Sequence, residues 1–252
     1  MPVPPRSARP SRPDSGSSLG TPSAAQPRKL SLAVWAVTAL AFIASYALLW
    51  CYVHVRVDTQ PCLVRLDDPL FALIPKDRRF FLVSHELYTG LTLGALALLV
   101  WWAYRGNHFP LVRFGAALSL QGLFRAVTLL LLPLCRVNIQ PGTVVLDHTP
   151  LVDLGIVRIP WRMWATNDLF FSGHVGEFLL LTWAMRGAPR PIIGVLVVFQ
   201  VVQAYALIAT RGHYTIDLLV AVPFAFMADR IAVAWLGKRR QSPRAVDAAV
   251  TA

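Results

Sequence analysis

The sequence has few charged residues. Only 15% of its 252 residues are Asp, Glu, Lys or Arg, whereas 56% are hydrophobic. Several apolar runs exceed the roughly 18 residues that a bilayer-spanning helix needs. Soluble domains do not supply six such runs separated by polar connections. The scarcity of charge therefore excludes an ordinary soluble domain and predicts an all-α, polytopic membrane protein.

Cysteine is equally scarce, with residues at positions 51, 62 and 135 only. None of them shows the CxxC or Cys/His spacing of a metal site. Cys51 fits a small packing residue inside an apolar run. Cys62 and Cys135 both fall in expected outer loops, and the sequence leaves open whether they form a disulfide.

Acidic residues are outnumbered, with 13 Asp and Glu against 24 Lys and Arg, which gives a formal charge of +11. Nucleic-acid-binding domains have such a balance, but no motif of that class accompanies it. The basic residues instead gather in the two tails and between apolar runs, where loop charge sets membrane topology. We therefore exclude nucleic acid as a partner and expect the bilayer instead.

Three segments follow from composition. Residues 1–29 are rich in Pro, Ser and Arg, which predicts a disordered tail. No cleavage pattern follows the first apolar run, so this tail is not expected to be a secretory signal. Residues 30–236 form the predicted membrane domain, and residues 237–252 form a basic C-terminal tail.

The membrane domain is predicted to be a six-helix transmembrane bundle. Its expected spans are Leu30–Val53, Phe81–Tyr104, Phe109–Leu134, Phe170–Met185, Pro191–Ala209 and Tyr214–Leu236. The fourth span is short and contains His174 and Glu177. Basic residues in the tails and short loops place both termini in the cytoplasm.

Segments that are far apart in the sequence can lie on the same side of the membrane, because successive spans alternate in direction. The end of the third span and the starts of the fourth and sixth must share one side of the membrane, whichever way the protein sits. Segments 125–133, 172–174 and 213–217 can thus converge, and the preferred orientation puts them on the extracytoplasmic face.

The candidate catalytic residues are His174, His213 and Asp217. Residues four apart lie on one face of a helix, so Asp217 can hold one ring nitrogen of His213 and make the other a better nucleophile. His174 comes from another span and can act as a general acid or base. The alternative is a structural polar pair at a helix start, which the HxxxD spacing alone would favour.

The longer strings NDLFFSGH (167–174) and RGHYTID (211–217) resemble the paired motifs of the sphingomyelin synthase family. That family is a branch of the type-2 phosphatidic acid phosphatase group, whose hallmarks are SGH and HxxxD. RAVTLLLLPL (125–134) resembles a further family segment more loosely. The resemblance covers the third to sixth spans in the right order.

The resemblance implies a role for each residue. His213 would attack the phosphorus of a phospholipid headgroup, and Asp217 would orient it. His174 would protonate the leaving lipid alkoxide and then deprotonate the incoming hydroxyl. Asp168 would support His174 or bind a cationic headgroup, with a helix cap as its alternative. Ser172 would either bind phosphate or cap a helix.

The sequence also departs from the family pattern. Asn167 stands where glycine is usual, and LDDPLFALIP (66–75) is only a weak echo of a proline-rich motif. Leu207 stands where the wider phosphatase group has arginine, which favours the sphingomyelin synthase branch and removes one phosphate clamp. Arg125 and Arg211 are the substitute clamps, because guanidinium groups bind phosphate oxygens bidentately.

These residues predict a lipid phosphotransferase that moves a phospho-headgroup from a glycerophospholipid to ceramide or another lipid alcohol, with no cofactor or metal. Hydrolysis by the same triad, as in a lipid phosphatase or a C-type phospholipase, is the second interpretation. A non-catalytic lipid-binding protein is the third. A metal site of two histidines and a carboxylate is a minor fourth. His85 and Glu86 are weaker candidates for the same cavity.

Overall fold

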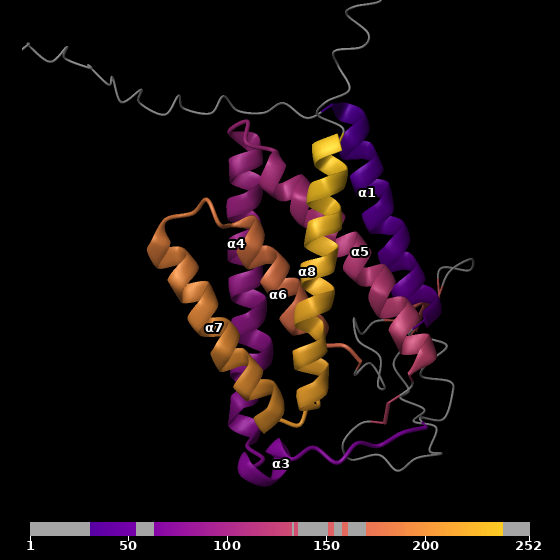
Figure 1. The fold of residues 1–252 in the computed structure, drawn as a ribbon, viewed down its shortest axis with the longest axis vertical. Coiled ribbons are helices and arrows are strands. Elements are labelled where there is room, and N and C mark those ends of the chain that lie inside the picture. The colour runs from indigo at the N-terminus through magenta and orange to yellow at the C-terminus, as the bar shows by residue number, and fades with distance from the viewer. Residues whose placement is uncertain are drawn as a thin grey trace, which may run out of the picture.

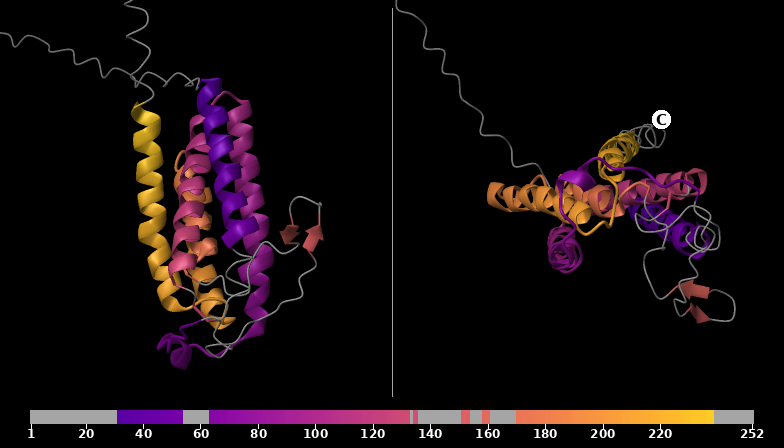
Figure 2. Two further views of the ribbon diagram at one scale, coloured as in Figure 1. Left: turned by 90° about the vertical axis from the view of Figure 1, so that its right-hand side faces the viewer. Right: turned by 90° about the horizontal axis from the view of Figure 1, so that it is seen from below.

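The computed structural model describes residues 31–53, 63–132, 134–135, 151–153, 158–160 and 170–238. Both predicted tails lie outside this range. The described chain is helical in class, and long helices run side by side along most of its length (Figure 1). A two-stranded antiparallel ladder, β1 (Leu151–Asp153) with β2 (Arg158–Pro160), stands to one side of the helices (Figure 2).

Each predicted apolar run contains a helix. These helices are α1 (Leu32–Ala47), which continues as the π-helix η1 (Leu48–Val53), α4 (Tyr88–Tyr104), α5 (Phe109–Leu131), α6 (Gly173–Ala184), α7 (Arg190–Ala209) and α8 (Thr215–Lys238). The shorter elements are α3 (Leu70–Leu73), the 3-10 helix η2 (Arg78–Phe80) and the π-helix η3 (Leu82–Leu87), which leads into α4.

Three helices in the described part of the chain are long and apolar enough to cross a membrane. They are Arg78–Tyr104, Phe109–Leu131 and Arg190–Ala209, and Leu32–Ala47 is a shorter apolar helix. Large apolar side chains face outward, such as Leu40 on α1 at 67% exposure and Val198 on α7 at 64%. An outward apolar surface of this extent is typical of a protein in contact with lipid. The six-span bundle itself stays a prediction.

Two helix boundaries differ from the prediction. The third helix ends at Leu131 rather than Leu134, because Pro133 disfavours helical backbone at the residue before it, and Leu132 has left the helical region, with φ −131° and ψ 74°. The fourth begins at Gly173 rather than Phe170, since the Ser172 side chain accepts from Val175 N and caps the helix. With 12 residues, α6 is about 18 Å long, shorter than the roughly 30 Å hydrocarbon core.

Helix α5 is central to the packing. It contacts α1, α4, α6 and α8, and α6 is enclosed among α4, α5, α7 and α8. The start of α1 and the end of α8 lie at one end of the bundle, whereas the start of α8, the start of α4 and α3 lie at the other (Figures 1 and 2). The segments that carry the candidate residues therefore meet at the end opposite the termini.

A buried ion pair joins α5 to α8 in the half of the bundle nearer the termini. Arg113 donates through Nε and Nη2 to the two carboxylate oxygens of Asp229, each at 2.7 Å, and its Nη1 donates to the Trp183 carbonyl at 3.2 Å. The two side chains are only 4% and 10% exposed. A charge placed so deep is costly unless it is paired in this way.

We expect Asp229→Ala to lower the free energy of unfolding by about 3–5 kcal/mol, because it leaves the Arg113 guanidinium buried without its carboxylate. Thermal unfolding in detergent micelles measures this loss. The control is Asp77→Ala, whose partner Arg79 is 91% exposed and whose loss should cost far less than the loss of Asp229. Equal losses in the two variants would contradict the assignment.

Candidate active site

His213 and Asp217 meet at the start of α8. A turn at Thr210–Gly212, with Arg211 at a φ of +61°, carries the chain from α7 to His213. His213 Nδ1 lies 3.5 Å from Asp217 Oδ2, and the two side chains are 6% and 0% exposed. His213 precedes the first helical residue, Thr215, so the pair forms across the helix start rather than along a helix face as predicted.

Asp217 is held by hydrogen bonds in addition to its contact with His213. Its Oδ2 accepts from Tyr214 N at 2.9 Å, so the carboxylate also caps the first turn of α8. Its backbone carbonyl accepts from Ser172 N at 3.1 Å, which ties the segment before α6 to α8. These bonds hold Asp217 in place beside the His213 ring. A distance of 3.5 Å is long for a hydrogen bond, but such bonds often tighten when substrate binds.

His174 faces His213 from the first turn of α6. The two ring centroids lie 5.8 Å apart with an interplanar angle of 70°. His174 is half-buried, whereas His213 is buried. Two imidazoles this close to each other can act on one reacting centre. The structure thus brings together the three predicted catalytic residues.

Arg125 reaches this site from α5. A Cβ atom added to Gly173 would overlap the Arg125 guanidinium, and one added to Gly176 would overlap the Gln121 amide. The glycine of the SGH string therefore permits a close approach of Arg125, whose guanidinium a side chain at position 173 would displace. Arg125 consequently lies next to the residue that precedes His174.

Thr128, three residues after Arg125 in the same segment, supports this placement. Thr128 Oγ1 lies within hydrogen-bonding distance of the Arg125 carbonyl, 3.0 Å, and of the Phe170 carbonyl, 3.3 Å. The end of α5 is thus attached to the chain just before α6. The loose resemblance of this segment to a family motif corresponds to a real contact with the SGH string.

Arg211 is engaged differently. Its guanidinium donates to the carbonyls of Ile208, Phe71 and Ile74 at 2.8–2.9 Å, and its Cζ lies 4.3 Å from the Phe71 ring centre. These contacts hold α3 against the turn between α7 and α8. They give Arg211 a structural function, so Arg125 is the better placed of the two predicted phosphate clamps.

Ser172 is buried, and its side chain makes the capping bond to Val175 N at 3.4 Å, in line with the capping alternative. Asp168 lies outside the described residues, so its role stays a prediction.

Cys135 is disulfide-bonded, and its carbonyl accepts from Tyr214 Oη at 2.9 Å. Cys62, which the sequence left open as its partner, lies outside the described residues.

Asp68 was not among the predicted site residues. Its carboxylate accepts from the backbone N and the Oγ1 of Thr215 and from Leu70 N, so it caps both α8 and α3. The echo of a proline-rich motif in LDDPLFALIP was the signal that could have identified it. After α3, Arg79 donates to Asp77 and holds the pKa of that carboxyl below its usual value.

Glu177 is a second residue that the site prediction left out. It lies three residues after His174, one turn further along the same helix, and accepts from Tyr46 Oη at 3.0 Å and Tyr88 Oη at 3.3 Å. The Tyr88 ring is also 4.8 Å from the His174 ring. An acidic residue inside an apolar run was the available signal.

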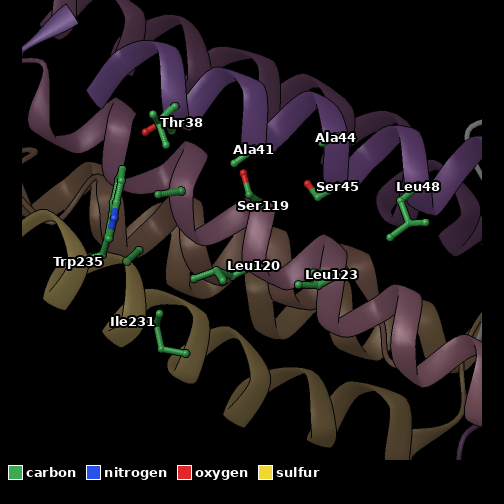
Figure 3. A pocket seen from close by; sticks show the side chains of 13 residues that line it. Thr38, Ala41, Ala44, Ser45, Leu48, Ser119, Leu120, Leu123, Ile231 and Trp235 are labelled. Carbon is green, nitrogen blue, oxygen red and sulfur yellow. The ribbon is translucent and has the colours of Figure 1, made fainter. Parts of the chain in front are cut away.

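An apolar pocket of about 490 Å³ lies away from the histidines, between α1, α5 and α8 (Figure 3). Its hydroxyl groups, on Thr38, Ser45 and Ser119, each donate to the backbone of their own helix. The pocket therefore presents hydrocarbon and carries no phosphorus chemistry.

Among the described residues, no group of three or more His, Cys, Asp and Glu side chains has a metal-binding arrangement.

Comparison with known proteins supports the importance of the segment that carries the histidines. A family model described as AtPDCT1/2 matches residues 164–234. Over 65 residues, the chain is 40% identical to phosphatidylcholine:diacylglycerol cholinephosphotransferase 1 of Arabidopsis thaliana and 37% identical to cholinephosphotransferase 2 of the same plant. The matches cover 25% of this chain and only 22% of each relative. These names pair phosphatidylcholine with diacylglycerol, whereas the sequence analysis also weighed ceramide.

We expect Gly173→Ala to lower the free energy of unfolding by about 1–3 kcal/mol, because its methyl group would displace the Arg125 guanidinium. Gly194→Ala on α7 is the matched control: its added methyl meets nothing within 4 Å, and alanine favours a helix by about 1 kcal/mol over glycine. Thermal unfolding of both variants and of the Gly173→Ala/Arg125→Ala pair measures the coupling. Additive effects of the two substitutions would argue against the contact.

Asp68→Ala should destabilise the start of α8 by about 1–2 kcal/mol, because Thr215 N loses its capping carboxylate. Hydrogen exchange of the amides at residues 215–217 reports this local loosening directly. The neighbouring Asp67 is exposed, so Asp67→Ala provides the control. The capping role would be refuted by faster exchange in both variants or in neither.

Proposed function

We propose that this chain is an integral-membrane lipid phosphotransferase that transfers a phosphocholine headgroup from phosphatidylcholine to diacylglycerol. The observation that carries the proposal is the placement of His174 and His213 with their ring centroids 5.8 Å apart, with Asp217 behind His213 and Arg125 against Gly173, the residue before His174. Such a site can attack phosphorus from one ring and supply a proton from the other.

The first half-reaction uses His213 as the nucleophile. Its Nδ1 faces Asp217, so Nε2 attacks the phosphorus and forms an N–P bond. The bond between phosphorus and the glycerol oxygen breaks, and the leaving alkoxide takes a proton from His174. The products are diacylglycerol and a phosphocholine group on His213.

The second half-reaction reverses these steps with a new acceptor. The hydroxyl of an incoming lipid alcohol attacks the phosphorus, gives its proton to His174 and displaces His213. The N–P bond breaks, the new O–P bond forms, and the proton count of the site returns to its starting value. The Arg125 guanidinium stabilises the phosphate charge during both steps.

The choice of substrates comes from the matched relatives, whose names pair phosphatidylcholine with diacylglycerol. The matched segment contains His174, His213 and Asp217. Ceramide, which the resemblance to sphingomyelin synthases implies, is the second acceptor to test. Release of the headgroup to water is the second candidate activity, because the same residues serve it.

We also propose that the six helical segments form one membrane-embedded bundle in which α6, too short to span the hydrocarbon core by itself, is enclosed by the others, with both termini in the cytoplasm and the site at the extracytoplasmic end. Support comes from the position of the histidines at the end of the bundle opposite the start of α1 and the end of α8 (Figure 1). The basic residues of the tails favour the cytoplasm.

The test incubates detergent-purified protein with phosphatidylcholine and either fluorescent diacylglycerol or fluorescent ceramide. We expect a fluorescent phosphatidylcholine, and a loss of at least about 100-fold in His213→Ala, because no other group forms the N–P bond. His108→Ala is the control, since His108 lies at the opposite end of the bundle beside Trp35.

The products distinguish the alternatives. Fluorescent sphingomyelin would make ceramide the acceptor, and free phosphocholine without a fluorescent product would make the protein a hydrolase. A chain that produces none of these, while His213→Ala and the wild type bind phospholipid equally, would be a non-catalytic lipid-binding protein.

A further inference from the structure

The apolar pocket between α1, α5 and α8 lies outside the proposed phosphorus chemistry (Figure 3). Helices α1 and α8 each pack on α5 and make few contacts with each other, so α5 forms the floor between them. Two glycines of α5 allow α1 to approach closely. A Cβ atom added to Gly115 would lie 3.2 Å from Thr38 Cγ2, and one added to Gly122 would lie 3.5 Å from the Ser45 hydroxyl. Close helix packing therefore fixes the walls of the pocket.

The pocket is closed at one end and open along its side. Near the termini, Val34, Val112 and Leu236 form a buried cluster, and Trp235, which also lines the pocket, packs against it. Along the side, four large apolar residues of the lining are exposed, namely Val37, Leu48, Leu123 and Ile231. A ligand can therefore enter from the surrounding hydrocarbon layer without passing through either end of the bundle.

An apolar row on α5 connects the pocket with the site. Val127 and Leu130 follow Leu123 on the same helix face, four and seven residues further on, and both are exposed. They lead to the end of α5, where Thr128 lies within hydrogen-bonding distance of the chain before α6. Arg125, the proposed phosphate clamp, belongs to the same turns of α5. The row therefore runs from the pocket to the level of the bundle at which Arg125 and the histidines meet.

The dimensions of the pocket restrict what can occupy it. From Val37 to Leu48, its α1 side extends about 16 Å, at about 1.5 Å per residue. A volume of about 490 Å³ over this length gives a mean cross-section of about 30 Å². A helix about 10 Å wide would need about 80 Å². An aliphatic chain, whose carbon atoms contact their neighbours at about 4 Å, needs roughly 20 Å². One hydrocarbon chain therefore fits, whereas a helix of a second copy does not.

The chemistry of the lining leads to the same occupant. The hydroxyls of Thr38, Ser45 and Ser119 each donate to a carbonyl of their own helix at 2.7–3.0 Å. None of the described residues that line the pocket is charged. A headgroup or a peptide segment would lose hydrogen bonds on entering such a pocket, which costs free energy. An aliphatic chain has no hydrogen bonds to lose.

We propose that this pocket holds one acyl chain of the phosphatidylcholine donor and thereby positions its headgroup at the site. The proposal rests on the proposed function, which makes phosphatidylcholine the donor. The donor is favoured over diacylglycerol because it carries a phosphate for Arg125, which lies on the helix that forms the pocket floor. A chain gains little hydrophobic energy on moving from the bilayer into the pocket, since both are apolar. Packing against the walls instead restricts the chain, and with it the position of the phosphorus.

Photo-cross-linking tests where the chain lies. The full-length protein is reconstituted in phosphatidylglycerol vesicles with a small fraction of phosphatidylcholine that carries a diazirine on one acyl chain. We expect cross-linked peptides from residues 37–48, 116–123 and 231–235. Added dipalmitoyl phosphatidylcholine should compete, whereas additional phosphatidylglycerol should not.

Two outcomes of this experiment would overturn the proposal. Equal competition by the two lipids would identify the occupant as ordinary bilayer lipid. Absence of cross-links from the three segments would show that no phosphatidylcholine chain enters, as when a second copy of the protein covers the pocket.

Variants that fill the pocket provide a matched comparison. Ala41→Phe/Ala44→Phe places two rings in the pocket, because both alanines line it and are exposed. Ala36→Phe/Ala39→Phe adds the same bulk to exposed positions of α1 outside the lining. We expect the first variant to lower the cross-linking yield at least about fivefold, since the rings occupy the volume of the chain, and the second to leave it unchanged. Equal yields in the two variants would contradict the proposal.

Kinetics provide the readout in the active enzyme. Ala41→Phe/Ala44→Phe should raise KM for dipalmitoyl phosphatidylcholine at least about fivefold and leave KM for dihexanoyl phosphatidylcholine unchanged. A hexanoyl chain is about 7 Å long when extended, at about 1.2 Å per bond, and fills less than half of the pocket. Equal changes for both lipids would indicate a general structural effect and count against the proposal. If the wild type transfers no headgroup, the proposed function fails, while the cross-linking result still decides whether the pocket holds this chain.

Discussion

The close packing of α5 on α6 is the constraint on which the site depends. Gly173 and Gly176 lack side chains, so Arg125 and Gln121 fit against the start of α6. A guanidinium deep in an apolar bundle needs polar surroundings, and this contact places it where the histidines meet. The same helix is anchored nearer the termini by the Arg113–Asp229 pair. Helix α5 therefore contacts the site near its C-terminal end and is paired with α8 near its N-terminal end.

The sequence was sufficient for the helices and for the convergence of the catalytic residues. Long apolar runs leave a chain in lipid no stable alternative to helix, because every backbone polar group must be bonded within its own segment. Counting the runs then placed His174, His213 and Asp217 at one end. What it did not supply was the detail at helix ends. The cap of Ser172 shortens α6, and His213 precedes α8 instead of lying in it.

The contacts that the sequence did not reveal join residues far apart in the chain through backbone atoms. Asp68 bonds to Thr215, 147 residues later, and Arg211 bonds to the carbonyls of Phe71 and Ile74. Every residue has a backbone carbonyl, so a hydrogen bond to a carbonyl cannot be recognised from the residue type in the sequence. Arg211 was therefore predicted as a phosphate clamp because its charge was visible, whereas the carbonyls that engage it were not.

The surroundings of the site bear on the choice between transfer and hydrolysis. Ile216 and Leu219, on the first turns of α8, are 41% and 62% exposed, so the outer face of α8 beside the site is apolar. A lipid alcohol that stays in the hydrocarbon layer can approach along this surface. At this end of the bundle, Asp68 is hydrogen-bonded to Thr215, and the residue after α3 is hydrogen-bonded to Arg211 in the turn before α8. A lipid acceptor that approaches the site can stay in contact with this apolar face of α8, and this favours headgroup transfer over hydrolysis.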